Sequence, residues 1–309
     1  MKPFLPHTDA SSPSQCFTIV LVVSYKDIRF VERTISALRA NVSECAPISL
    51  ITDCRSIREN GPRLCNRFSL ELIDEDVLLP GLTLERVKAV LAIRGRTNGA
   101  GWYFQQFLKM GFALSGRSLP YYLFWDADTI PLNPIGFFEG EQILFNPKKE
   151  HHQPYFDTIS NLFGINRWPG FSFISEHFMV DRSIMAEMLG KIASSGNSSW
   201  WENILSAADL KENNSFSEME TFGNYCQVFH PGLYKARKLD SFRAAGKMFG
   251  RSVSDRELAL LAYDFDTASF ERKHHPNGIR GLRSRLRWAW TEFHHRICRP
   301  LSGKSKVQA

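Results

Sequence analysis

The chain has 309 residues, a formal net charge of +6 and an apolar share of 43%, values that are ordinary for a soluble globular protein. No stretch approaches the roughly 20 consecutive apolar residues of a membrane-spanning helix. Prolines and an acid occupy the N-terminal segment where a secretory signal would be apolar. The six cysteines show neither a CxxC pair nor a zinc-site spacing. We therefore expect a cytoplasmic protein without a disulfide framework or a structural zinc site.

The positive charge is concentrated at the C-terminal end of the chain. Residues 276–309 contain eight Lys or Arg residues and one acid, a formal charge of +7, which leaves −1 for residues 1–275. A near-neutral body lacks the basic surface that nucleic-acid binding requires. We therefore expect no nucleic-acid partner for the body of the chain.

Two kinds of apolar pattern alternate along the first 125 residues. Residues 17–24, FTIVLVVS, form a nearly continuous β-branched run, which is typical of a strand buried on both faces. Shorter apolar runs follow, separated by segments whose apolar residues recur at roughly helical spacing. The sequence predicts strands at 17–24, 48–53, 70–79 and 121–125, and helices over 30–38 and 100–115.

The alternation of strands and helices predicts an α/β fold with a mostly parallel sheet covered by helices. In such sheets, ligands bind beyond the carboxyl ends of the strands. Three acids, Asp53, Asp126 and Asp128, fall at such ends. The sequence therefore predicts a binding site along this edge of the sheet.

The stretch WDADTI places two acids directly after an aromatic strand. In an extended chain, residues two apart project to the same side, so Asp126 and Asp128 converge and repel each other unless a cation lies between them. Oxygen ligands suit Mg²⁺ or Mn²⁺, which keep positions open for substrate phosphate. The pair therefore predicts a metal site that neutralises a departing diphosphate. Alternatively, one acid caps a turn and the other is a solvated loop residue.

These residues also carry a family resemblance. LFWDADTIPL (123–132) resembles the DxD segment of GT-A type glycosyltransferases, which use nucleotide-diphosphate sugars. In consistent order over roughly residues 17–270, the chain is similar to a bacterial branch of uncharacterised transferases linked to surface polysaccharide synthesis. The resemblance implies a GT-A (Rossmann-like) fold, a nucleotide-sugar donor and a Mn²⁺ or Mg²⁺ ion. The other similar stretches are GWYFQQFLK (101–109), SEHFMVDRSIMAEML (175–189), WWENIL (200–205) and FSEMETFGNY (216–225).

The resemblance implies roles for several residues at the donor side. Asp126 and Asp128 would hold the metal on the diphosphate, and Tyr25 and Asp27 of the SYKD loop would border the nucleotide. Asp53 would accept hydrogen bonds from the base or the ribose. The alternative role of Asp53 is to cap the N-terminus of the next segment.

The stretch GWYFQQFLK would face the donor from a helix. Trp102, Gln105 and Lys109 are the candidates, and the lysine would counter the charge of the diphosphate. If these are plain helix residues instead, Trp102 belongs to the core and Lys109 to the solvent.

Transfer with inversion requires a group that activates the acceptor hydroxyl, and a carboxylate is the usual solution. SEMETFGNY supplies Glu218 and Glu220, which on a helix project about 200° apart, so only one can face the site. We predict Glu218 as the catalytic residue, with Glu220 as the next candidate. Alternatively, both belong to a helix start, since Ser217 precedes them and Glu220 has the third position of a capping box. If configuration is retained, these acids only orient the acceptor.

Two histidines compete for the remaining metal position. A late histidine is often the third metal ligand of GT-A enzymes, which favours His230 in FHPG over His177 in SEHFMVD. We assign His177 to the acceptor side, although a lone histidine is more often a structural residue. Trp200 and Trp201 have flat apolar faces that suit stacking on an acceptor sugar. Core packing is the alternative for these tryptophans.

The C-terminal end predicts a separate helical tail. We assign residues 1–16 to an N-terminal extension, 17–272 to the catalytic domain and 273–309 to the tail. A basic amphipathic helix of this kind suits an anionic membrane surface, or it docks on the catalytic domain. A peripheral position on the inner face of the membrane would fit a lipid-linked acceptor. The apolar positions of the tail helix are Ile279, Leu282, Leu286, Trp290, Phe293 and Ile297.

The function that these patterns favour is metal-dependent transfer of a sugar from a nucleotide-diphosphate donor to a glycan or glycolipid hydroxyl. A first rival is a phosphohydrolase with Asp126 as nucleophile and Asp128 as acid/base. The haloacid dehalogenase-like phosphatases usually have Thr or Val two positions after the second Asp, where this chain has Ile130. A second rival is a non-catalytic module that binds a nucleotide sugar or a glycan.

Overall fold

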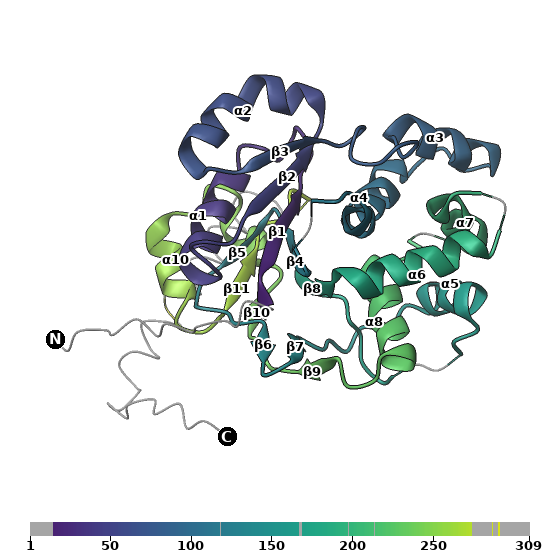
Figure 1. The fold of residues 1–309 in the computed structure, drawn as a ribbon. Helices are drawn as coiled ribbons and strands as arrows, with labels where there is room; N and C mark the ends of the chain where they lie inside the picture. The colour runs from purple at the N-terminus through teal and green to yellow at the C-terminus, as the bar shows by residue number, and fades with distance from the viewer. Residues whose placement is uncertain are drawn as a thin grey trace.

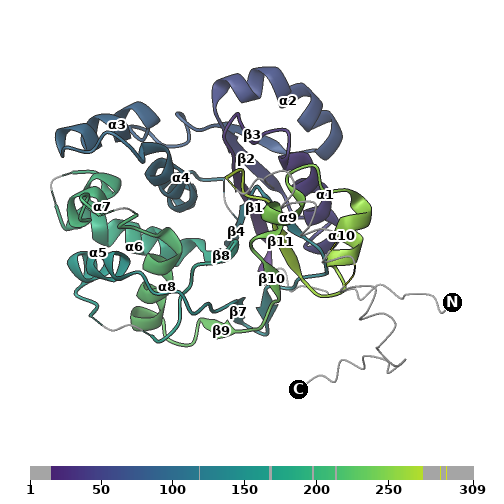
Figure 2. The same cartoon turned by 180° about the vertical axis from the view of Figure 1, so that it is seen from behind.

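The protein is described by a computed structural model in which helices pack on both faces of a central sheet (Figures 1 and 2). Two small sheets of three strands each complete the fold. The structure describes residues 15–117, 119–166, 169–196, 198–212 and 214–273, together with Leu286 and Trp290.

The central sheet has five strands in the order β3-β2-β1-β4-β8. All neighbouring strands are parallel except β4 and β8, which are antiparallel. Asp126 of β4 lies opposite Val22 of β1, and Val22 lies opposite Ile51 of β2, so the carboxyl ends of these strands meet at one edge. The strands are β1 (Phe17–Val22), β2 (Ile48–Thr52), β3 (Glu71–Asp74), β4 (Tyr121–Asp126) and β8 (His177–Asp181).

Two groups of helices cover the sheet, as Figures 1 and 2 show from opposite sides. The smaller group is α1 (Val31–Asn41) and α2 (Cys54–Phe68). The larger group is α3 (Leu84–Ile93), α4 (Ala100–Gly111), α5 (Gln153–Phe163), α6 (Arg182–Ser194), α7 (Trp200–Ala207) and α8 (Glu218–Phe229), with the 3₁₀ helix η2 (Phe112–Leu114) after α4.

The core follows the alternation of side chains along β1, because successive residues of a strand point to opposite faces. Val20 and Val22 belong to the apolar core that includes residues of α4, α6, α7 and α8. Ile19 and Leu21 belong to the core that includes residues of α1 and α2. All four side chains are buried, which explains the unbroken apolar run in the sequence. The predicted α/β class with a mostly parallel sheet is confirmed.

The last third of the chain returns to the carboxyl edge of the central sheet. β11 pairs antiparallel with β5, which begins one residue after Asp128, so that Ser269 lies opposite Thr129. This pairing carries the segment after β11 to the two predicted metal ligands. The small sheets contain β5 (Thr129–Pro131), β10 (Ser241–Phe242) and β11 (Thr267–Ser269), and β6 (Phe138–Glu139), β7 (Gln142–Phe145) and β9 (Tyr234–Ala236); α9 (Ala245–Phe249) and α10 (Asp255–Leu261) complete this part.

One predicted element is shorter than the sequence indicated. The predicted strand 70–79 ends at Asp74, because the backbone N–H of Asp76 donates to the Asp74 carboxylate at 3.1 Å and starts a turn. The predicted helix 100–115 continues after Gly111 as the 3₁₀ helix η2. The other predicted strands and the first helix agree with the structure to within a few residues.

The N-terminal extension and the basic tail fall largely outside the described residues. In the tail the structure describes Lys273, Leu286 and Trp290, and the last two side chains are exposed. The domain boundaries and the amphipathic helix therefore stay predictions. Within the described part of the chain, none of the helices combines the length and the apolarity needed to cross a bilayer.

The contact between α8 and Phe173 gives a test of the packing. A Cβ atom on Gly223 would lie 2.2 Å from Cγ of the buried Phe173 ring. We expect Gly223→Ala to lower the free energy of unfolding by about 1–3 kcal/mol, despite the better helix propensity of alanine. The control is Gly190→Ala in α6, where a Cβ atom would meet nothing within 4 Å and should add up to about 1 kcal/mol. Urea denaturation measures both, and equal effects would contradict this packing.

Candidate active site

A cleft with a volume of about 510 Å³ opens at the carboxyl edge of the central sheet, a size typical of small-molecule sites. The loop after β1, the end of β4 and the segment after β3 form its sheet side. The remainder is formed by Leu84 of α3, helix α4, Tyr155 of α5, the segment before β8, the start of α8 and the segments after β10 and β11. Segments distant in sequence therefore meet at the edge where the sequence predicted a site.

Asp126 and Asp128 both line this cleft. Asp126 is the last residue of β4, and its backbone N–H donates to the carbonyl oxygen of Glu176 at 2.9 Å. Asp128 follows in the turn before β5, and its carbonyl oxygen accepts from the backbone N–H of Phe270 at 2.8 Å. Backbone pairing to two later segments thus fixes both acids at the lip of the sheet.

Asp128 lies among several acids and has no ion-pair partner of its own in the described part of the chain. Burial and then the charges of Asp126, Glu271 and Asp27 raise the pKa of its carboxyl to about 7, while Arg251 acts in the opposite direction. Arg251 also forms an ion pair with Asp27. A bound cation would offset the negative charge around Asp128 and stabilise the ionised form of its carboxyl.

The donor set fits Mn²⁺ or Mg²⁺ held jointly with a substrate. Asp126 and Asp128 provide carboxylate oxygens, which are hard ligands suited to these ions. No group of three or more His, Cys, Asp or Glu residues that could hold a metal occurs in the described ranges. A two-carboxylate site completed by water and phosphate oxygens is a common form of magnesium binding, so the residues present fit such an ion.

Lys109 connects the metal-site acids with the start of α8. Its Nζ donates to Oδ1 of Asp126 at 3.0 Å and to Oε1 of Glu218 at 2.9 Å, and its side chain is only 7% exposed. Burial works against the charged form, but the charges of Asp126 and Glu218 outweigh it, and the pKa of Lys109 is raised. Gln106, one turn earlier on the same helix, accepts from the backbone N–H of Glu218 at 3.0 Å. α4 therefore holds the first residue of α8 at two points.

The two glutamates of α8 face different surroundings, as their angular separation on a helix requires. Glu218 lines the cleft. Glu220 does not line it and instead accepts hydrogen bonds from Ser172 Oγ at 2.7 Å, Phe173 N at 3.1 Å and Asn224 Nδ2 at 3.2 Å. The structure thus gives Glu220 a buried structural position and leaves Glu218 as the candidate for chemistry.

The predicted donor residues divide into two groups. Asp27, Trp102 and Gln105 line the cleft together with Lys109. Tyr25 does not line the cleft and donates to Glu59 Oε2 at 2.6 Å, and its role beside the nucleotide stays a prediction.

Asp53 has the alternative role that the sequence left open. It is the N-cap residue of α2 and accepts from Ser56 N at 2.9 Å and Ser56 Oγ at 2.7 Å. The side chain of Asp53 does not line the cleft. Asp53 therefore has the capping role, and its hydrogen bonding to the base or ribose stays a prediction.

Neither predicted histidine reaches the metal-site acids. His230 ends α8, and its Nε2 lies 3.1 Å from Oε2 of Glu187. Twelve residues of helix separate it from Glu218, about 18 Å along the axis, so its assignment as a third metal ligand is wrong. His177 is buried, stacks on Trp125 with ring centroids 4.8 Å apart and does not line the cleft. Burial lowers the pKa of His177 well below its usual value, and its acceptor role is also wrong.

Trp200 and Trp201 lie in the core rather than in the cleft. They are 8% and 2% exposed, and both rings pack near Phe107 of α4, with centroids 5.7 and 6.1 Å from it. Neither residue lines the cleft, so neither ring offers a face to an acceptor sugar. Core packing, the alternative left open by the sequence, holds for both.

Several cleft residues were not singled out from the sequence. Glu75 follows β3 directly, but the predicted strand 70–79 extended past it, so the rule for acids at strand ends did not identify it. Tyr155, Glu176 and Arg243 lie in segments where the sequence gives no such signal.

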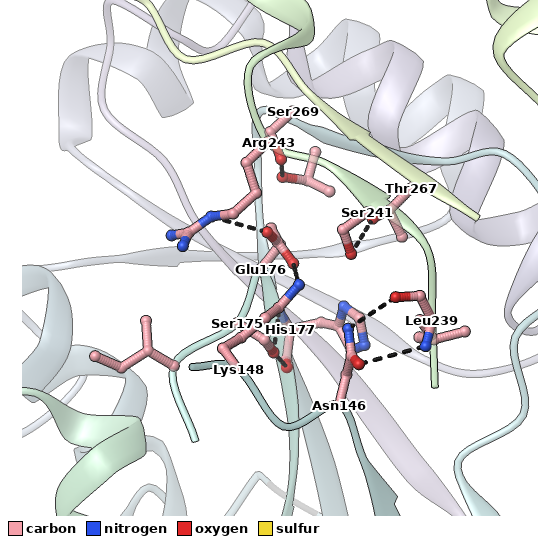
Figure 3. Close-up of polar contacts among 12 residues, drawn as sticks. Asn146, Lys148, Ser175, Glu176, His177, Leu239, Ser241, Arg243, Thr267 and Ser269 are labelled. Carbon is pink, nitrogen blue, oxygen red and sulfur yellow. Dashed lines mark hydrogen bonds and ion pairs between the residues drawn. The ribbon is translucent and has the colours of Figure 1, made fainter. Parts of the chain in front are cut away.

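Figure 3 shows the Glu176 carboxylate between Arg243, whose Nε lies at 3.0 Å, and Lys148, whose Nζ lies at 3.7 Å. This ion pair links the segment after β10 to the start of β8.

The fold is similar to those of several glycosyltransferases, although no protein-family model and no curated protein sequence matches the chain. Mouse xyloside xylosyltransferase 1 is 13% identical with a TM-score of 0.42 over 82% of this chain and 96% of that chain. The bifunctional glycosyltransferase WbbM is 10% identical with a TM-score of 0.48 over 94% of this chain and 52% of that chain. The galactosyltransferase LgtC, solved with donor and acceptor sugar analogues, is 9% identical with a TM-score of 0.42 over 82% and 86%. At these values, activity has to be argued from the cleft itself.

The charge environment of Asp128 predicts an unusual stability effect. Its folded-state pKa of about 7 lies above the unfolded value of about 3.9. The native state therefore binds more protons between these pH values, and stability falls as pH rises through this window. We expect Asp128→Asn to raise the free energy of unfolding at pH 8 by about 1–3 kcal/mol, a value reduced for partial exposure, and to have little effect at pH 4.

The matched control for this measurement is Asp126→Asn, which removes one partner of the buried Lys109 ammonium and should lower stability. Chemical denaturation of both variants in chelator at the two pH values measures the difference. Equal destabilisation by the two substitutions at pH 8 would show that the negative charge of Asp128 does not lower the stability of the folded protein.

Proposed function

We propose that the chain is a metal-dependent glycosyltransferase that moves a sugar from a nucleotide-diphosphate donor to a hydroxyl of a glycan or lipid-linked saccharide. The proposal rests on the meeting of Asp126, Asp128, Lys109 and Glu218 in one cleft. Paired carboxylates suit a divalent ion that also binds phosphate. A further carboxylate nearby suits activation of a hydroxyl. Together these groups supply both halves of a glycosyl transfer.

The donor half would lie along α4 and the end of β4. Asp126 and Asp128 would hold Mn²⁺ or Mg²⁺ against the diphosphate. When bound, such an ion neutralises the charge on a departing nucleoside diphosphate. Trp102 and Gln105 are the α4 residues that would border the nucleotide, since both line the cleft. Asp27, in the loop after β1, closes this side and is held by Arg251.

Lys109 acts in this scheme as a positioning residue. One ammonium group lies within 3.0 Å of an oxygen of Asp126 and 2.9 Å of an oxygen of Glu218. The metal-site acid and the acceptor-side acid are therefore held at a fixed separation. Such a separation is needed because the leaving oxygen and the attacking hydroxyl must both lie close to the same anomeric carbon.

Glu218 is the residue that would contact the acceptor hydroxyl. Its Oε1 accepts from Lys109, and no hydrogen bond to its Oε2 is found among the described residues, so that oxygen is available to a ligand. In an inverting course Glu218 takes the proton of the attacking hydroxyl; in a retaining course it orients the acceptor. A lipid-linked acceptor would suit the predicted basic tail and a position on the cytoplasmic face of the membrane.

Ligand-dependent stabilisation tests the proposed donor and metal together. A ligand that binds only the native state at 100 times its Kd adds about 2.7 kcal/mol to stability. We expect at least one nucleotide-diphosphate sugar to raise the Tm by several degrees with Mn²⁺ and not in chelator. Asp128→Asn, compared with its own baseline, should show no such rise. The proposal fails if no nucleotide sugar raises the Tm, or if chelator leaves the rise unchanged.

A pair of glutamate substitutions separates catalysis from structure in α8. If the enzyme inverts configuration, Glu218→Gln should lower the rate of Mn²⁺-stimulated donor hydrolysis, with water as acceptor, by at least about 100-fold. Glu220→Gln replaces a carboxylate that accepts from Ser172, Phe173 and Asn224, and should lower stability by about 1–3 kcal/mol with a change in rate of only a few fold. The opposite pattern would move the catalytic role to Glu220.

A further inference from the structure

Glu75 lies at the end of the cleft opposite to the metal-site acids. Asp126, Val22, Ile51 and Ile73 are aligned across four neighbouring strands, so Ile73 is three strand spacings, about 14 Å, from Asp126. Glu75 follows Ile73 by two residues and lines the cleft. This separation matches the distance from the diphosphate of a nucleotide to the far edge of its base.

Glu75 differs from the acids around it because its carboxylate has no partner in the described part of the chain. Asp53 accepts from Ser56 N at 2.9 Å, Asp74 accepts from the backbone N–H of Asp76 at 3.1 Å, and Asp76 accepts from the backbone N–H of Leu84 at 3.1 Å. Each of these three acids thus serves a turn or a helix start. Glu75 makes no such bond, and it is the only one of the four that lines the cleft.

The surroundings of Glu75 lack a compensating cation. Burial and then the charges of Asp53, Asp76 and Asp74 raise the pKa of Glu75 to about 7, and no described Lys or Arg is paired with it. A ligand group that donates hydrogen bonds would therefore stabilise this carboxylate, whereas a phosphate or another acid would repel it.

An aliphatic and an aromatic side chain, Leu84 and Trp102, line the same cleft as Glu75. Leu84 is held there by its backbone hydrogen bond to Asp76 and lines the cleft. Trp102 lines the cleft from α4, which packs against α3, and its ring is fixed edge-on by Tyr103 at 4.9 Å. An indole face and an aliphatic side chain suit stacking on a purine.

We propose that Glu75 binds the Watson–Crick edge of guanine, and that the donor is a guanosine-diphosphate sugar. This inference rests on the proposed function, and it specifies the base of the nucleotide donor. Guanine presents two adjacent donors on that edge, the ring N1–H and the exocyclic amino group. The two oxygens of one carboxylate accept both in parallel, as in a bidentate charge-assisted pair.

The other common bases do not match a carboxylate at this position. Uracil has one donor, N3–H, between two carbonyl oxygens, so the second oxygen of Glu75 would face a like partial charge. Cytosine and adenine each place an acceptor nitrogen beside their amino group, which again opposes one carboxylate oxygen. Only guanine satisfies both oxygens without repulsion.

Calorimetric binding of GDP, UDP, CDP and ADP to the full chain with Mn²⁺ at pH 8 tests this inference. We expect the wild-type protein to bind GDP at least about ten-fold more tightly than each other nucleotide. Glu75→Gln should weaken GDP binding at least about ten-fold, because an amide N–H₂ then opposes one guanine donor, and should not weaken UDP binding. Glu85→Gln, the same change on an exposed side chain of α3, is the control and should leave all four affinities unchanged.

The outcomes separate this inference from the function on which it rests. Preference of the wild-type protein for another base, or full GDP affinity in Glu75→Gln, overturns the guanine assignment and leaves the proposed transferase standing. Failure of all four nucleotides to bind overturns both. The wild-type ranking needs no variant, so the inference stays testable if Glu75→Gln does not fold.

Discussion

The site depends on one buried cation, Lys109, which is held between two carboxylates that come from different elements of the fold. Burying an ammonium group costs several kcal/mol unless it is paired and hydrogen-bonded, and Asp126 and Glu218 both pair with it at about 3 Å. Because Lys109 lies on α4, this arrangement joins that helix to the end of β4 and to the first residue of α8. A charge network therefore contributes to the geometry of the cleft, in addition to apolar packing.

Asp27, Glu176 and Glu271 of the cleft also have ion-pair partners, but Asp128 and Glu75 have none among the described residues. Asp128 and Glu75 both have a pKa raised to about 7 by burial and by neighbouring acids, which lowers the stability of the free protein. Perturbed carboxyls that line a cleft are more common at functional sites than elsewhere. Asp128 lies where a metal ion bound with a diphosphate would stabilise its negative charge. Glu75 lies where a base that donates hydrogen bonds would stabilise its carboxylate. The cleft thus has two separate places where a ligand would stabilise a carboxylate. Asp128 would be stabilised by positive charge and Glu75 by hydrogen-bond donors, and the two are spaced like the two ends of a nucleotide.

The sequence was sufficient to predict the fold and the site where a local pattern determines the structure. The continuous apolar strands and the acids after them predict the sheet, its carboxyl edge and Asp126, and helix geometry separates Glu218 from its neighbour. Long-range packing is different, because a sequence does not show which aromatic residues are covered. Trp201 was therefore assigned to an acceptor although it is 2% exposed, and His230 was assigned to a metal that a whole helix separates from it. Glu75 also follows a strand, but the sequence placed it inside the predicted strand 70–79, because the turn at Asp74 depends on a side-chain hydrogen bond that the apolar pattern does not show.

The central claim is that the two acids after β4 bind a divalent ion jointly with a nucleoside diphosphate. Calorimetric titration of Mn²⁺ into the full chain, with and without a nucleoside diphosphate, tests this claim most directly. The account predicts uptake of a single ion that tightens in the presence of the nucleotide and is lost when Asp126 and Asp128 are both replaced by Asn. Unchanged Mn²⁺ uptake in that double variant, or no uptake by the wild-type chain with any nucleoside diphosphate, would contradict it.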